Sequence, residues 1–401
     1  MTAQTLDFNI SAELRDDLER WRKRSLTVGL AAAAVTAIGF LFFPLKFQFY
    51  RSYLWSYILL VGLSVGPLAW LMLQYVTGGA WGTVIRRPCE AAARTIPLAA
   101  LLFLPIVIGI PNLYEWSHAG KVAASEALRH KQPYLNVPFF LARAALYFGG
   151  WAFLSWFFNR WSAVEDREGG AVAHRKMAAL AGPGLMFWGF SVTFMAIDWV
   201  LSLDPRWFST IFGMLFIAGQ GLTSMAFLVT LMVLLSRRRP MSEVLTPRHL
   251  HDLGKFLLAL VMVWAYFSYS QFLIIWSGNL PAEIPWYLER LRGGWQYVAL
   301  ALVLGHFALP FALLLSRDLK RNYKLIAGIA VFILFMRYVD VYWVVAPDFL
   351  KGSFGVSWMD FTAPVALGGI WLSFFLAQLE KRPLMPMGDP HLQEALQHGR
   401  E

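Results

Sequence analysis

Cysteine and charged side chains are both scarce in this sequence. Cys89 is the only cysteine among 401 residues, and charged residues make up 15% of the chain. One thiol excludes an internal disulfide, and it excludes an iron–sulfur cluster held by this chain's own cysteines, which needs several thiolates. Soluble domains carry about 25% charged residues. The low charge therefore argues against a soluble fold.

Sequence motifs for haem and nucleotide binding are also missing. No CxxCH haem-attachment motif and no GxxxxGK[ST] phosphate-binding loop occurs. A bis-His haem within the membrane needs two intramembrane histidines, and only His306 lies inside an expected span. The sequence therefore predicts that this chain binds no metal, haem or other redox cofactor of its own.

Apolar residues are abundant: they form 58% of the chain, with 18 Trp and 32 Phe. A membrane span needs about 20 apolar residues in a helix. This pattern predicts an all-α, polytopic membrane protein of about ten transmembrane helices. The expected spans are 25–43, 53–76, 95–110, 137–158, 177–203, 208–235, 255–276, 295–315, 324–343 and 361–376.

The distribution of basic residues predicts the orientation of these spans. Ten spans place both termini on one side, where the segments outside the spans hold 24 Lys and Arg when Lys255 and Lys324 at the starts of two spans are included, against 9 on the other side. Basic residues are concentrated in cytoplasmic loops. We therefore expect a multi-pass protein of the bacterial inner (cytoplasmic) membrane with N and C termini in the cytoplasm. The net charge of +10 then reflects topology, and no nucleic-acid partner is expected.

A faint internal repeat predicts how the spans are grouped. An Arg-Arg-Pro string follows the second expected span at 86–88 and the sixth at 238–240. The alternative is that basic residues gather at membrane edges in any case. The repeat predicts a membrane domain, 25–376, with two four-helix bundles at 53–203 and 208–343 and flanking helices at 25–43 and 361–376. A polar cytoplasmic helix is expected within 1–24, and a cytoplasmic tail over 377–401.

Several polar residues fall within the expected spans, where a charge costs about 2.5–3.5 kcal/mol on insertion scales. Such residues usually face a bundle interior or water, so they are candidates for a proton path. Arg337 and Asp340 share one helical face and form a proton relay, a substrate contact or a structural salt bridge. Asp198 has no partner at helical spacing, so it either needs one from another helix or stays protonated through desolvation. The alternative for His306 is a satisfied core histidine. The candidates are Asp198, Gln220, Tyr269, Gln271, His306, Arg337 and Asp340, and apart from Tyr269 they are expected to converge inside the protein.

A second set of residues lies toward the opposite side from the termini. Glu115, Trp116 and His118 stand in the expected outer loop 111–136, and Arg143 lies near the outer end of the fourth span. A carboxylate and an imidazole beside an aromatic residue can contact a quinone head group, which makes these four candidate quinone contacts. The alternatives are ordinary loop residues and, for Arg143, a side chain that snorkels to the interface.

Three strings in the second half carry a family resemblance. They are SLDPRWFST at 202–210, SQFLIIW at 270–276 continuing to GNLP at 278–281 and WY at 286–287, and RYVDVYW at 337–343. Together they resemble the ActF subunit of bacterial alternative complex III, a relative of the NrfD (polysulfide reductase-like) membrane subunits. The resemblance is strongest over 177–360, and the ten-span layout fits the whole chain.

The resemblance implies a membrane subunit of a respiratory or photosynthetic electron-transfer complex that oxidises quinol and reduces cytochrome c or a similar carrier. It implies two four-helix bundles and a quinone-side or proton-conducting role without a redox centre. The expected partners are an ActC-like NrfD-type membrane subunit, an iron–sulfur subunit and c-type haem subunits, which carry the haems and clusters. The resemblance assigns no catalytic residue to a position of this sequence. A secondary transporter and a structural membrane scaffold are the alternatives.

Overall fold

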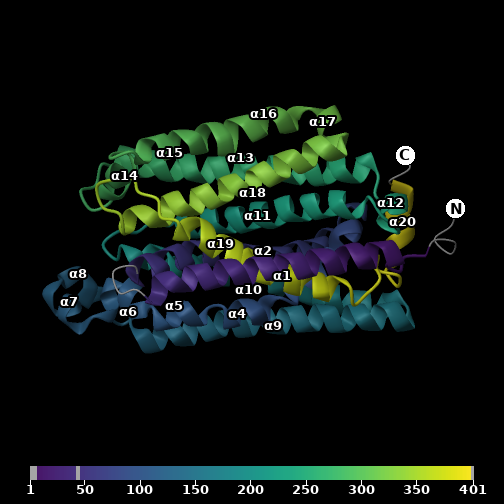
Figure 1. The fold of residues 1–401 in the computed structure, drawn as a ribbon, viewed down its shortest axis with the longest axis horizontal. Coiled ribbons are helices and arrows are strands. Elements are labelled where there is room, and N and C mark those ends of the chain that lie inside the picture. The colour runs from purple at the N-terminus through teal and green to yellow at the C-terminus, as the bar shows by residue number, and fades with distance from the viewer. Residues whose placement is uncertain (1–6, 42–45, 399–401) are drawn as a thin grey trace.

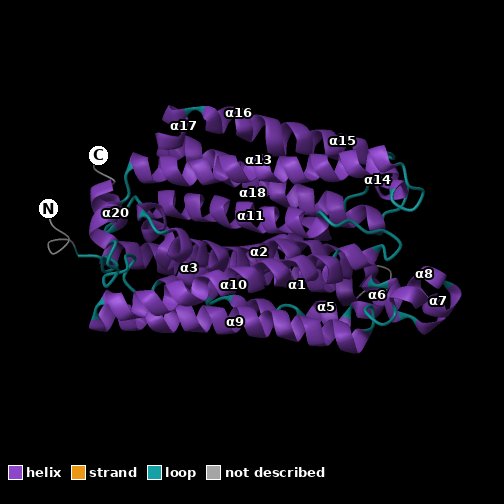
Figure 2. Ribbon diagram, turned by 180° about the vertical axis from the view of Figure 1, so that it is seen from behind, coloured by secondary structure: helices purple, strands orange, loops and turns teal. Residues whose placement is uncertain are grey.

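The structure, a computed structural model, describes residues 7–41 and 46–398, and within these ranges it consists of helices and connecting turns without strands (Figure 2). Ten helical segments are long and apolar enough to cross a membrane. Many large apolar side chains on these segments are exposed, such as Leu146, Met186 and Val303. The predicted all-α fold with about ten spans is confirmed, and the chain is a multi-pass membrane protein.

Eight of these segments contain one long helix, and two, the third and the eighth, are assembled from shorter pieces. Seven of the long helices are α1 (Ala12–Leu41), α2 (Lys46–Thr77), α9 (Val137–Glu168), α11 (Phe212–Leu235), α13 (Pro247–Gly278), α18 (Tyr323–Val345) and α19 (Met359–Leu379). The fifth segment joins α10 (Gly170–Trp199) to η5 (Leu201–Leu203). Short connecting helices are α12 (Met241–Val244), α14 (Ile284–Arg290), α17 (Arg317–Arg321) and η7 (Ala346–Asp348), and α20 (Leu392–His398) follows α19.

Prolines explain why the third segment is broken. It runs through η3 (Ala80–Ile85), α3 (Arg86–Ala93), α4 (Ile96–Leu101) and α5 (Leu104–Ile108), and α6 (Ile110–Leu113) follows it. Pro97, Pro105 and Pro111 each stand in the first turn of a new short helix. Proline has no N–H to donate to the preceding turn, so the helix restarts at each one. The loop beyond holds η4 (Glu115–Ser117), α7 (Ala119–Ala124) and α8 (Glu126–Lys131).

The eighth segment is interrupted by a wide turn. It consists of α15 (Trp295–Ala301), the π-helix η6 (Leu302–Ala308) and α16 (Leu309–Leu315). Pro310 lies four residues after His306, so the His306 carbonyl lacks its usual N–H donor and the α-helical pattern cannot continue there. Single π-turns of this kind are frequent at functional sites.

The helices form two groups that meet along α2, α10 and α11 (Figure 1). In one group, α9 and α10 pack together and against α2; in the other, α11 packs against α13 and α18, and α16 lies against α13. The central helices α2 and α11 have the largest buried share of the ten segments, 78% each. α1 packs along α19 beside the first group. The division into two four-helix bundles with two flanking helices stays a prediction from the sequence.

Both termini lie at one end of the molecule, whereas α7, α8 and α14 lie at the other end (Figure 1). Several expected boundaries differ from the structure, and most spans are longer than expected. The polar helix expected within 1–24 is continuous with the first span, because α1 begins at Ala12. The third segment begins at Ala80 rather than at 95. The expected tail begins inside α19, which ends at Leu379, and its described part, up to residue 398, packs against the bundles with Asp389 and Leu392 buried. The end of the first expected span, 42–43, lies outside the described residues.

Candidate functional site

A buried ionic cluster lies in the second bundle, on the inner face of α18. Arg337 forms an ion pair with Asp340 one turn later, and both side chains are buried. Nε of Arg337 donates to the Thr223 hydroxyl on α11 at 3.3 Å. Nε1 of Trp264 on α13 donates to Asp340 Oδ2 at 3.2 Å. Three helices therefore supply donors or acceptors to one charge pair, as the cost of bare charge within a bilayer requires.

His306 joins this cluster through Trp264. Its ring packs edge-on against the Trp264 indole, with centroids 4.2 Å apart. The His306 side chain is fully buried, and neither ring nitrogen has a hydrogen-bond partner among the described residues. A buried polar group without a partner is uncommon in folded proteins. His306, at the π-turn beside a charge pair, is therefore a functional candidate rather than a satisfied core histidine.

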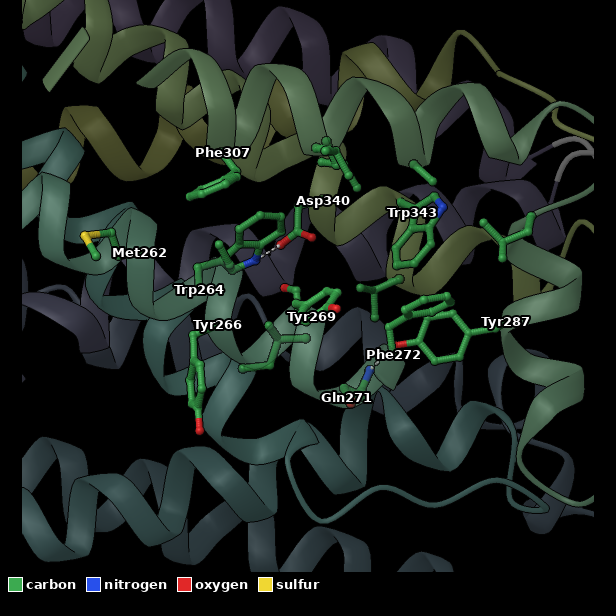
Figure 3. A pocket seen from close by; sticks show the side chains of 18 of the residues that line it. Met262, Trp264, Tyr266, Tyr269, Gln271, Phe272, Tyr287, Phe307, Asp340 and Trp343 are labelled. Atoms are coloured by element: carbon green, nitrogen blue, oxygen red, sulfur yellow. Dashed lines mark hydrogen bonds between the residues drawn. The ribbon is translucent and has the colours of Figure 1, made fainter. Parts of the chain in front are cut away.

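A cavity of about 750 Å³ adjoins this cluster (Figure 3). Its walls come from α13, α14, the α15–η6–α16 segment and α18, and they are mostly apolar and aromatic. Asp340 and Trp264 stand at one part of the wall, and Gln271 and Tyr287 at another (Figure 3). Tyr269 also lines it, but at the rim, where its side chain is 64% exposed.

The expected convergence of six polar residues is only partly correct. All six are buried. Arg337, Asp340 and His306 come together, and Gln271 lines the adjoining cavity, where its Oε1 accepts from the Ser209 hydroxyl at 2.9 Å. The side chain of Gln220 instead faces α2: a Cβ placed on Gly62 would lie 2.3 Å from Gln220 Oε1. Asp198 lies in the first bundle.

Asp198 has a partner on another helix, which was one of the two alternatives from the sequence, and the partner is Arg143. Nε and Nη2 of Arg143 on α9 donate to the two carboxylate oxygens at 2.9 and 2.8 Å, and the Tyr147 hydroxyl donates at 2.7 Å. Nη1 of Arg143 donates to the Tyr134 carbonyl. Arg143 therefore neither snorkels to the interface nor joins the other quinone candidates. The pair fixes α9 to α10.

The remaining quinone candidates do not form one site. Trp116 is buried in the core and stacks on Tyr114, with centroids 5.0 Å apart. Glu115 and His118 line a polar pocket of about 480 Å³ at the end opposite the termini. Burial alone would raise the pKa of Glu115, but the positive charges of Lys121 and Arg206, each 3.4 Å away, outweigh it and hold that pKa below its ordinary value.

A larger ionic network near the termini was missed by the sequence analysis. Arg86 and Arg87 are buried and share Glu90, at 3.1 and 2.7 Å. Arg86 also pairs with Glu165 on α9 and, at 2.6 Å, with Asp389 in the C-terminal segment. The Arg-Arg string thus lies buried within the third segment and not in a loop between spans. The available signal was Glu90, placed three and four residues after two arginines, which is helical ion-pair spacing.

A second missed pair lies at the opposite end. Arg290 on α14 is buried and donates to Asp348 at 2.8 Å, and its guanidinium lies over the Trp286 ring, 3.6 Å from the centroid. Both residues fall outside the expected spans, so the cost of charge in a bilayer gave no reason to select them. The pair joins the α14 loop to the end of α18.

Comparison with models of known protein families and with curated proteins gave no match for this chain. Among the described residues, no group of three or more His, Cys, Asp or Glu side chains is arranged to hold a metal ion. The absence of a resident redox cofactor stays a prediction from the sequence.

Proposed function

We propose that this multi-pass membrane protein is a subunit of a bacterial quinol:electron-acceptor oxidoreductase of the alternative complex III type, similar to ActF. In this proposal it lies in the cytoplasmic membrane with both termini in the cytoplasm. It carries no electrons itself and supplies a proton- or quinone-handling module. Partner subunits, an ActC-like membrane protein, an iron–sulfur protein and c-type haem proteins, carry the redox centres.

The observation that carries this proposal is the cluster of Arg337, Asp340 and His306 beside an apolar cavity. A purely structural ion pair needs only its own partners. Here a histidine that has no hydrogen-bond partner in the described part of the chain packs against the tryptophan that donates to the carboxylate. Carboxylate and imidazole groups buried within spans are typical of proton relays. The RYVDVYW string that carries the resemblance contains both members of the ion pair.

Of the two alternatives, a secondary transporter has less support. Transporters of repeated architecture commonly place broken helices at corresponding positions in both halves. The broken segments here are the third and the eighth. When spans two to five are matched with spans six to nine, the third span corresponds to the seventh and the eighth to the fourth, so the two broken segments are not at corresponding positions. A structural scaffold remains the alternative that the experiments must separate.

Copurification tests membership of the complex. A chain tagged at its C-terminus and isolated from the source membrane in mild detergent should bring down subunits that show c-type haem absorbance and iron–sulfur signals. Isolation of the chain without either signal, under conditions that keep other respiratory complexes intact, would contradict the proposal.

The role of the cluster is tested in the assembled complex. Asp340→Asn should preserve the haem spectra of the partners and lower turnover or the number of protons moved per electron, because the amide cannot exchange a proton as the acid does. Asp318→Asn is the matched control, since Asp318 is exposed on α17. Unchanged turnover and proton coupling in an assembled Asp340→Asn complex would leave the cluster with a structural role only.

A further inference from the structure

The cavity beside Asp340 opens sideways on the membrane-facing surface. Tyr266 and Tyr269 on α13 and Val303 on η6 all line it, and their side chains are 66%, 64% and 57% exposed. All three belong to candidate membrane spans. A molecule dissolved in the bilayer therefore reaches the cavity between α13 and η6 without passing through water.

The size and the aromatic lining of the cavity suit an apolar ring compound. Its volume of about 750 Å³ is within the ~300–1,000 Å³ that small-ligand pockets commonly have. Aromatic rings form much of one wall: Trp286 meets Trp343 edge-on at 5.7 Å, and Phe272 meets Tyr287 at 5.2 Å. Rings in such edge-on arrangements present flat faces and edges against which another ring packs favourably.

One polar group in the cavity wall determines which kind of polar head group a ligand can place there. The hydrogen bonds from Arg337 and Trp264 to the Asp340 carboxylate both end on Oδ2. The second oxygen points away from Trp264, and Asp340 itself lines the cavity (Figure 3). A carboxylate paired with arginine is an acceptor only. The preferred partner is therefore a hydrogen-bond donor, whereas a carbonyl or phosphate oxygen would place two acceptors together.

A second polar position lies farther along α13. Gln271 donates to the Tyr287 hydroxyl at 3.2 Å, and both line the cavity. Gln271 comes seven residues after Trp264, which is about 10 Å along a helix. The cavity thus offers a charged acceptor at one place and a neutral amide–phenol pair at another, with apolar walls between them.

We infer that this cavity binds a lipid-soluble hydroquinone, whose hydroxyl donates to Asp340 while its apolar tail leaves between Tyr269 and Val303 into the bilayer. The inference rests on the proposed function and deepens it, because it assigns a quinol site to the second bundle of this chain. It also predicts selectivity: the reduced ring, with hydroxyl donors, binds more tightly than the oxidised ring, whose oxygens only accept.

Photolabelling tests the site directly. The intact chain, in its complex or in lipid nanodiscs, is illuminated under anaerobic conditions with a decyl hydroquinone that carries a diazirine near the ring. The labelled peptides should come from α13 and from the α15–η6 segment. Unlabelled decyl hydroquinone should suppress labelling at a concentration about tenfold lower than decyl quinone does, as expected for loss of a charged hydrogen bond.

A pair of neighbouring substitutions supplies the control. Ala299→Trp fills the cavity and should reduce labelling about tenfold, because the ring then has no space. Leu300→Trp adds the same side chain at the next position, which is exposed and does not line the cavity, and should leave labelling unchanged. Asp340→Asn should weaken the preference of the cavity for hydroquinone over quinone.

Three results would overturn the inference: label placed outside these segments, equal labelling of the Ala299→Trp and Leu300→Trp chains, or displacement of the probe by phospholipid as readily as by decyl hydroquinone. The last result would identify the cavity as an acyl-chain site. If photolabelling fails but haem subunits still copurify with the chain, only the quinol site is disproved. If photolabelling succeeds but no redox subunit copurifies, the proposed complex is disproved and the quinol site stands.

Discussion

Arg143 and Asp198 form a two-pronged ion pair between α9 and α10, with nitrogen–oxygen distances of 2.9 and 2.8 Å and both side chains buried. Two parallel N–H···O bonds fix the relative orientation of the groups as well as their distance. Tyr147 donates a third bond to the same carboxylate. The carboxylate is thus satisfied within the protein, in contrast to Asp340, which lines a cavity.

The first prediction concerns the stability of this pair. Arg143→Met should lower the free energy of unfolding by about 3–5 kcal/mol, because it leaves Asp198 buried without its counter-charge. Adding Asp198→Leu to the same chain should restore much of the loss. Denaturant unfolding in micelles measures both. Arg160→Met, at an exposed position of α9, is the control and should change little. Equal stability of the Arg143 and Arg160 variants would show that the pair contributes nothing.

The second prediction concerns the C-terminal segment. Asp389 accepts from buried Arg86 at 2.6 Å, Arg382 donates to the Asn159 carbonyl at 2.8 Å, and the Ala395 carbonyl meets a ring nitrogen of His249 at 3.1 Å. The segment therefore contacts both bundles. Asp389→Ala should speed proteolysis of residues after Leu379, since a charged hydrogen bond contributes about 1.5–3 kcal/mol.

Glu394→Ala is the matched control for this experiment. Glu394 lies on α20, is exposed, and pairs with the partly exposed His391. Exposed ion pairs contribute about 0–1 kcal/mol, so this change should leave proteolysis as it is. Identical cleavage rates for the two variants would mean that Asp389 does not hold the segment.

The third prediction concerns the close contact of α1 with α19. A Cβ on Gly29 would lie 2.7 Å from the Ile370 backbone nitrogen, so the two helices approach nearly backbone to backbone. Small residues permit such packing between membrane helices. Gly29→Ala should destabilise the chain by about 1–3 kcal/mol through overpacking. Gly368→Ala, where a Cβ meets nothing within 4 Å, should be neutral or slightly stabilising, and thermal unfolding in detergent compares the two.

The fourth prediction concerns orientation. The only native cysteine, Cys89, is buried, so cysteines placed on the surface can be labelled selectively. Asp318→Cys on α17 should resist a membrane-impermeant maleimide added to intact cells, and Ala282→Cys before α14 should react. Both positions are exposed. Labelling of position 318 and protection of position 282 from outside would reverse the topology.

The sequence by itself determined the number, kind and approximate limits of the membrane spans. Length and apolar composition are local properties of a segment. An apolar segment long enough to cross the bilayer forms a helix whatever its tertiary contacts are. The limits of the helices could not be predicted where proline or a π-turn interrupts a helix. A run of apolar residues does not show which backbone hydrogen bonds of the helix are missing.

The tertiary structure alone decided which polar residues share a site. Arg337 and Asp340 could be paired from the sequence because one helix fixes their spacing. Asp198 could not be paired with Arg143, since 55 positions separate them and their contact depends on how α9 rotates against α10. The same packing places Trp264 between Asp340 and His306. Charge burial is set locally by the membrane, whereas the choice of partner is set by the rotation and register of neighbouring helices.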